Sequence, residues 1–130
     1  WSAKGVMFNL TASMRYYLYP YPTDLRKSFY TLSGIVCDLM RRNVQDGEVF
    51  IFINRSCTSM KVLHLECGGL VIYHLKLESG TFRLPFMEEN VTSFPTNWQE
   101  LMMMVRGLGE AKDVHEKRWK KTLKSPVFMG

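Results

Sequence analysis

The chain has 130 residues, of which 46% are hydrophobic and 22% charged, and its formal net charge is +5. Such a composition is typical of one folded globular domain and excludes fibrous and disordered proteins. A chain of this length buries enough surface to fold without disulfides or metals, so its three cysteines are interpreted as free thiols of a reducing cytosol. No apolar run reaches the ~20 residues of a membrane span and no cleavable leader is recognisable, which predicts a cytoplasmic protein without membrane contact.

A short strand is the first predicted element. Residues 1–6 carry no pattern and are interpreted as an upstream addition, with Met7 as the natural start. The aromatic segment 14–19 favours a strand. Pro20 and Pro22 end this strand, because proline has no amide hydrogen to donate to a neighbouring strand.

A long helix is predicted after the strand. Apolar residues recur at intervals of three and four, which is the spacing of one helix face. Thr23 or Asp24 is placed to cap the first turn, and Arg41 and Arg42 suit the negative end of the helix dipole. The pattern therefore predicts one helix over 24–42 that buries Leu25, Phe29, Leu32, Val36 and Leu39.

The middle third of the chain predicts an antiparallel meander. Segment 48–53 is almost continuously apolar, so this strand is expected to be central and covered on both faces. Segments 60–66 and 70–78 predict two further strands around the Gly68-Gly69 pair, which tolerates a tight hairpin turn. Segment 81–84 predicts a fourth strand that a proline ends.

The glycine pair also predicts the register of the hairpin. With this pair as a two-residue turn, Lys61 lies opposite Lys76, and His74 lies beside them on the same face. His64 then lies on the other face, opposite Tyr73. Like charges that face each other destabilise a sheet, by something of the order of ~0.2–1 kcal/mol, and a bound anion would relieve this repulsion.

The last third of the chain returns to helical spacing. One helix is predicted with an apolar face made of Trp98, Leu101, Met102 and Val105. The consecutive methionines at 102–104 cannot all face one core, so at least one of them is expected at the surface. A second, strongly charged helix is predicted over 110–124.

Together these elements predict an α+β fold in a single domain. The expected architecture is an antiparallel β-meander of about four to five strands packed against one long helix, with two C-terminal helices. Residues 7–88 are expected to form the core, and residues 89–130 are expected to be a helical extension of the same domain.

Several separated motifs resemble one protein family. The first reads Pro22-Thr23-Asp24-Leu25-Arg26-Lys27-x-Phe29. It is similar to the Pro-Thr-Asp-Met-Arg-Lys signature of TnpB, the accessory protein encoded by the second reading frame of the sixty-six family of bacterial insertion sequences. The similarity continues in order and at the family's spacing through 49–55, 60–63, Gly69 and 76–85. Where the family has Trp-Asp-Gly-Asp-Gly, this chain has Leu65-Glu66-Cys67-Gly68-Gly69.

This resemblance implies a cytoplasmic bacterial protein that is encoded beside a transposase and is needed for full transposition. The transposase of the same element is the implied partner. The resemblance carries over no catalytic residue, no cofactor and no metal ligand, because the family has no agreed active site. The oligomeric state and the exact molecular role stay open.

Two groups of polar residues suggest other chemistry, and both have simpler explanations. A zinc site would use His64, His74, Cys57 and Cys67, but their spacing fits no zinc motif and the two histidines lie on opposite faces. A metal-dependent nuclease would use Asp24, Glu48 and Glu66 with Lys61. In the simpler interpretation Asp24 caps a helix and Glu48 begins a buried strand.

Basic residues are the most informative candidates for a binding site. The predicted set that contacts nucleic-acid phosphates consists of Arg26, Lys27, Arg55, Lys61 and Lys76. The charged C-terminal helix adds a second set, Lys117, Arg118, Lys120 and Lys121. In the alternative interpretation each lysine pairs with Glu66 or Glu78, or is simply solvated.

The preferred function is that of a non-enzymatic accessory protein, which assists the transposase by binding DNA or RNA phosphates through a basic face. One alternative is a protein-interaction subunit of the transposase complex that makes no nucleic-acid contact. A small metal-dependent nuclease is the second alternative. The first two differ in one measurable property, because phosphate contacts make affinity strongly dependent on salt.

Overall fold

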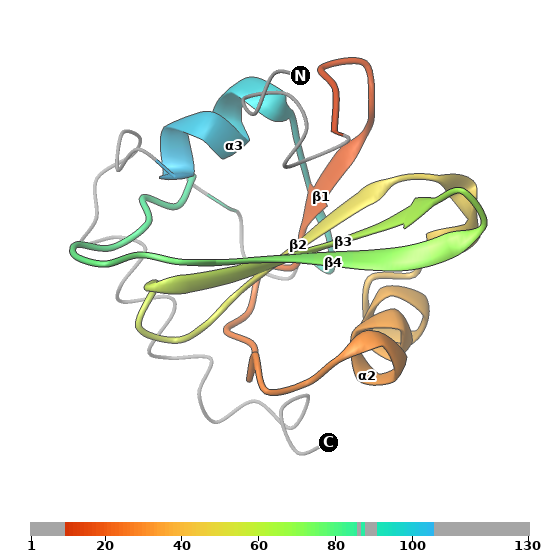
Figure 1. Cartoon of the computed structure of the whole chain (residues 1–130), viewed down its shortest axis with the longest axis horizontal. Coiled ribbons are helices and arrows are strands. Elements are labelled where there is room, and N and C mark those ends of the chain that lie inside the picture. Colours follow the sequence, from red (N-terminus) through yellow and green to blue (C-terminus); the bar gives the residue numbers. More distant parts are fainter. Residues whose placement is uncertain (1–9, 86, 88–90, 106–130) are drawn as a thin grey trace.

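One mixed sheet forms the centre of the molecule, and helices lie on both of its sides (Figure 1). The computed structural model describes residues 10–85, 87 and 91–105. The strands are arranged in the order β4-β3-β2-β1-β5, and they are β1 (Tyr16–Leu18), β2 (Val49–Ile53), β3 (Ser59–Glu66), β4 (Gly69–Lys76) and β5 (Phe94–Thr96). The helical elements are α2 (Phe29–Gly34), the π-helix η1 (Ile35–Leu39), the 3-10 helix η2 (Val44–Asp46) and α3 (Trp98–Val105).

The strand directions correct the expectation of an antiparallel meander. β1 runs parallel to β2, with Tyr16 opposite Val49 and Leu18 opposite Ile51. The other three pairs, β2 with β3, β3 with β4 and β1 with β5, are antiparallel. Parallel neighbours need a crossover connection, and the segment that contains α2 and η1 provides it. The α+β class is retained, but the sheet is mixed.

The predicted long helix over 24–42 is wrong at both ends. Asp24 does not cap a helix, because its carboxylate accepts the Arg26 amide at 3.0 Å and also binds the Arg26 guanidinium. This arrangement holds the segment in a turn, in which the Lys27 amide donates to the Asp24 carbonyl. Ser28 is the N-cap residue, and α2 begins directly after it. At the other end η1 finishes at Leu39, before the predicted limit at residue 42, and Arg41 has a φ of +61° that no helix residue adopts.

The hairpin between β3 and β4 turns one residue earlier than predicted. Its two turn residues are Cys67 and Gly68, with φ of +51° and +82°, rather than the glycine pair. A two-residue turn with two positive φ angles matches the twist of the flanking strands. As a result Lys61 lies opposite His74, and Lys76 lies opposite Ser59.

The turn geometry leads to a prediction about Cys67. A non-glycine residue with positive φ is strained, and asparagine tolerates this conformation better than cysteine. We expect Cys67→Asn to stabilise the protein by about 0.5–1 kcal/mol in urea unfolding. Cys67→Ala is the control, because it removes the thiol without relieving the strain. Equal stabilities of the two variants would contradict the prediction.

The C-terminal part of the described chain differs from the prediction in two elements. Segment 81–84 is not a strand, because the Phe82 amide donates to the Cys57 carbonyl at 2.7 Å and the Arg83 amide donates to the Met104 carbonyl at 3.2 Å. β5 was not predicted, since its central residue is Pro95, which is acceptable only in an edge strand such as this one. The helix predicted around Trp98 is confirmed as α3. The helix predicted over 110–124 lies outside the described residues.

β2 separates two apolar layers, which confirms that it is the central strand. All five of its residues are buried. One layer contains Val49, Ile51 and Ile53 together with Leu101 and Met104 of α3. The opposite layer joins the α2–η1 segment to the sheet and contains Phe50, Phe52, Leu63, Leu32, Val36 and Met40. The two helices are therefore held to opposite faces of the sheet by separate cores (Figure 1).

Candidate functional site

The five predicted basic residues lie toward one end of the sheet, where β2 and β4 finish. The Thr23 amide donates to the carbonyl of Ile53 at 2.9 Å, so the turn that carries Arg26 and Lys27 runs beside the end of β2. Arg55 lies in the loop that joins β2 to β3. We call this region the basic corner and define it as Arg26, Lys27, Arg55, Lys61, His74 and Lys76.

Lys61 connects the sheet to the turn before α2. Its half-buried ammonium group donates a hydrogen bond to the backbone carbonyl of Lys27, with an Nζ to O distance of 2.7 Å. Lys61 lies opposite Phe52 on β2, on the face that packs against α2. This bond holds the basic turn against β3, so Arg26 and Lys27 are displayed from a fixed backbone.

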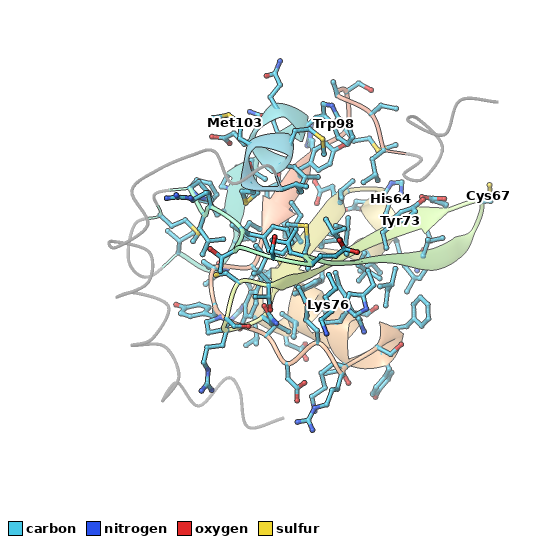
Figure 2. All side chains as sticks on the ribbon, turned by 60° about the vertical axis from the view of Figure 1, so that its left-hand side comes forward. His64, Cys67, Tyr73, Lys76, Trp98 and Met103 are labelled. Atoms are coloured by element: carbon cyan, nitrogen blue, oxygen red, sulfur yellow. The ribbon has the colours of Figure 1, made fainter. Side chains whose placement is uncertain are left out.

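His74 and Lys76 complete the basic corner on the same face as Lys61. The direct opposition of Lys61 and Lys76 that the sequence predicted is wrong, but the register differs by two residues and therefore leaves each side chain on its predicted face. Figure 2 shows Lys76 on the side of the sheet where α2 lies. Partial burial lowers the pKa of His74, and the charges of Lys61 and Lys76 lower it further.

Arg26 and Arg55 are exposed and differ in their partners. The Arg26 guanidinium binds both oxygens of Asp24, and these hydrogen bonds hold the pKa of the Asp24 carboxyl well below its usual range. One positive charge of the basic corner is therefore already paired. Arg55 forms no ion pair with any residue of 10–85, 87 or 91–105.

Two exposed aromatic residues next to the basic turn were missed by the sequence interpretation. Phe29 was assigned to the buried helix face but is 45% exposed, and Tyr30 is 93% exposed. Both belong to the first turn of α2, directly after Lys27 and Ser28. The signal available in the sequence was the run of two aromatic residues after two basic ones, which a helix beginning at residue 24 concealed.

The carboxylates proposed for a nuclease have separate partners. Glu48 binds Arg42 through two hydrogen bonds of 2.7 and 2.9 Å. The Glu66 carboxylate accepts one hydrogen bond from the Tyr73 hydroxyl and lies 3.3 Å from a ring nitrogen of His64. Figure 2 shows His64 and Tyr73 together, on the side of the sheet away from Lys76.

The possible zinc ligands are also separated. His64 and His74 occupy opposite faces of the hairpin, as predicted, although His64 pairs with Val71 rather than with Tyr73. Among the described residues no group of three or more histidine, cysteine, aspartate or glutamate side chains is placed to hold a metal ion.

The second basic set, Lys117, Arg118, Lys120 and Lys121, lies outside the described residues. In the part of the chain that the structure describes, no helix combines the length and the hydrophobicity of a membrane span.

Comparisons with known proteins identify similar sequences. A family model described as "IS66 Orf2 like protein" matches residues 14–115. The chain is 32% identical over 66 residues to the uncharacterized protein y4hO of Sinorhizobium fredii, which covers 51% of this chain and 57% of y4hO. It is 23% identical over 87 residues to the uncharacterized protein y4jC of the same organism, which covers 67% of this chain and 73% of y4jC. No solved structure matches the chain significantly.

Proposed function

Because the chain belongs to the IS66 Orf2-like family, whose members are accessory proteins of insertion sequences, we propose that it assists its transposase by binding nucleic-acid phosphates at the basic corner. The family match confirms the resemblance that began with the motif at 22–29. The accessory role follows from the family, whereas contact with nucleic acid and with the transposase belongs to the proposal.

The arrangement of Lys61, His74 and Lys76 is the observation that supports phosphate binding. Three groups that carry or accept positive charge lie together on one face. Within the described part of the chain neither lysine forms an ion pair, and Glu66, one suggested partner, lies on the other face. Like charges held close together repel each other, and a phosphate between them removes that repulsion.

Salt dependence is the first test of phosphate binding. We expect the affinity for a short labelled DNA duplex to fall steeply between about 50 and 200 mM salt, because each phosphate contact releases counterions. Lys76→Gln should weaken binding and reduce the slope of log affinity against log salt by about one. Arg41→Gln is the matched control, since Arg41 is exposed and its neighbour Arg42 binds Glu48 at the other end of β2. Binding that is absent, independent of salt or equally weakened by both substitutions would refute the proposal.

The protonation of His74 provides a second test. Its pKa lies below the ordinary 6.5 in the free protein, and a bound phosphate adds negative charge that should raise it. By linkage, binding should tighten as the pH falls below 6.5 and the imidazole takes up a proton. Because the pKa of His74 is lower in the folded protein than in the unfolded chain, the unfolded chain binds more protons in that pH range. The free protein should therefore lose stability there.

An NMR titration of the histidine ring protons measures this shift directly. The pKa of His74 should increase when a single-stranded oligonucleotide is added, and Lys76→Gln should increase it in the free protein. His64 is the internal control, since it lies on the opposite face. A pKa of His74 that the oligonucleotide leaves unchanged would argue against phosphate binding at this place.

A protein-interaction role is the second candidate, and the surface of α3 favours it. Met104 is buried and Met103 is 44% exposed, which confirms the expectation that at least one of the three methionines reaches the surface. Figure 2 shows Met103 on α3, away from Lys76. An exposed methionine suits an adaptable protein contact. Loss of transposase binding in Met103→Ser, with unchanged DNA affinity, would favour this candidate.

We also propose that the protein acts without catalysis. The family is not known as a family of enzymes, and the carboxylates suggested for a nuclease have separate partners. The test is incubation of plasmid DNA with magnesium or manganese. Cleavage that disappears in Glu66→Ala would overturn this part of the proposal.

A further inference from the structure

We propose that the basic corner selects single-stranded nucleic acid, with the rings of Tyr30 and Phe29 stacking on unpaired bases next to the basic turn that carries Arg26 and Lys27. This inference rests on the proposed function and adds the class of nucleic acid that is bound. Its basis is the exposure of these rings, their position after the basic turn and the rigidity of the segment that carries them.

The exposure of the two rings is unusual for this molecule. The described chain has three exposed large hydrophobic residues, and two of them are the adjacent Phe29 and Tyr30. Tyr30 is 93% exposed, and within the described residues its hydroxyl has no hydrogen-bond partner. Core packing and internal hydrogen bonding therefore do not account for this side chain, which is free to contact a ligand.

The rings are attached to a rigid part of the fold. Leu32 and Val36 are fully buried and fasten the α2–η1 segment to the sheet. Tyr30 precedes Leu32 by two residues, which places it about opposite the buried face of a helix with 3.6 residues per turn. In the turn just before this segment, the Lys61 ammonium donates a hydrogen bond to the Lys27 carbonyl at 2.7 Å. A rigid display limits the conformational entropy that is lost on binding.

The combination of cations and aromatic faces favours single strands over duplexes. Lysine contacts to phosphates do not distinguish the two forms strongly, because both present a charged backbone. In a duplex the faces of the bases are covered by neighbouring bases, whereas an unpaired base exposes a face on which an aromatic ring stacks. Stacking also tolerates every base type, so the inferred preference is for strandedness and not for sequence.

The decisive experiment compares a labelled oligothymidine with a labelled duplex of equal length at one salt concentration. We expect the wild-type protein to bind the single strand about tenfold more tightly than the duplex. Tyr30→Ala should remove most of this difference and leave the duplex affinity unchanged. Because no charge is lost, the salt slope for the single strand should not change, whereas Lys76→Gln should lower it by about 0.7.

Two controls separate stacking from general damage. Tyr30→Phe keeps the ring and should bind the single strand like the wild type. Met103→Ala removes an exposed hydrophobic side chain from the other side of the sheet and should have no effect on either probe. A third variant, Phe29→Leu, tests the second ring: leucine keeps an apolar side chain at this 45% exposed position, so the variant should weaken single-strand binding without unfolding the protein.

The outcomes distinguish this inference from the proposed function. Equal affinity for both probes, weakened by Lys76→Gln but not by Tyr30→Ala, would overturn the inference and leave phosphate binding in place. An equal loss for both probes in Tyr30→Ala would also overturn it, because a stacking ring affects only unpaired bases. Absence of binding to either probe would overturn both proposals and would leave the exposed rings as a contact for a protein partner.

Discussion

Replacement of Arg42 by methionine is expected to destabilise the protein by about 3 kcal/mol. The reason is Glu48, whose side chain is only 8% exposed and whose carboxylate accepts hydrogen bonds of 2.7 and 2.9 Å from the Arg42 guanidinium. The guanidinium also lies 3.8 Å from the centre of the Tyr17 ring. Without Arg42 the carboxylate stays buried, and exposed Arg15 at 4.0 Å is too distant to take over both hydrogen bonds.

Urea unfolding of a double-mutant cycle tests this explanation. Glu48→Leu combined with Arg42→Met replaces both charges by apolar groups and should recover much of the lost stability, because an isolated buried charge costs more than an absent pair. The double variant should therefore lose clearly less stability than the sum of the two single losses. A double variant that loses as much stability as the two single variants together would show that Arg42 does not stabilise the carboxylate.

Phe52→Ala is the second substitution with a large expected effect, a loss of about 3–5 kcal/mol in the free energy of unfolding. Phe52 is fully buried, and its ring lies 6.0 Å from that of Tyr19 in the layer between the sheet and α2. The cavity would open next to Lys61, which lies opposite Phe52 in the register. The substitution should therefore also weaken binding at the basic corner.

Comparison with a smaller change separates the cavity from other causes. Phe52→Leu leaves much of the volume filled and should cost about 1–1.5 kcal/mol in the same urea titration. The cost should thus follow the volume removed. A similar loss for alanine and leucine would indicate that the aromatic character of Phe52, and not its volume, stabilises this layer.

The strongly patterned elements of the fold were predictable from the sequence. The apolar run of β2 indicated a strand covered on both faces, and all its residues are buried. The hairpin of β3 and β4 and the helix around Trp98 were also recognisable from their periodicity. In each case burial of one or both faces determines the side-chain pattern, so the pattern records the structure.

The remaining features depend on interactions that periodicity does not record. The direction of β1 is determined by the crossover connection, and hydrophobic alternation is the same for parallel and antiparallel neighbours. The beginning of α2 is determined by hydrogen bonds between Asp24 and Arg26, which compete with helix formation. The hairpin turn uses Cys67, although cysteine is not a usual residue for positive φ.

The candidate site was predictable only in part, for the same reasons. A shift of two residues in the register preserves the face of every side chain, so Lys61, His74 and Lys76 lie on one face despite the incorrect turn. The hydrogen bond from Lys61 to the Lys27 carbonyl joins residues that are distant in sequence, and no local pattern predicts it. The exposure of Phe29 follows from the late start of α2, which makes it the first residue of the helix, whereas Tyr30 lay outside the predicted apolar face.

The position of β1 in the sheet has a consequence for folding during synthesis. Both neighbours of β1 come later in the chain, since β2 supplies 49–51 and β5 supplies 94–96. The β2–β3 and β3–β4 connections are short, whereas pairing of β1 with β2 closes a long loop, so we expect the hairpins to form before β1 is inserted. During that interval the most apolar strand has one unpaired edge, and such an edge pairs readily with other chains. We therefore expect a chain in which β1 has not yet been inserted to aggregate more readily than the folded protein.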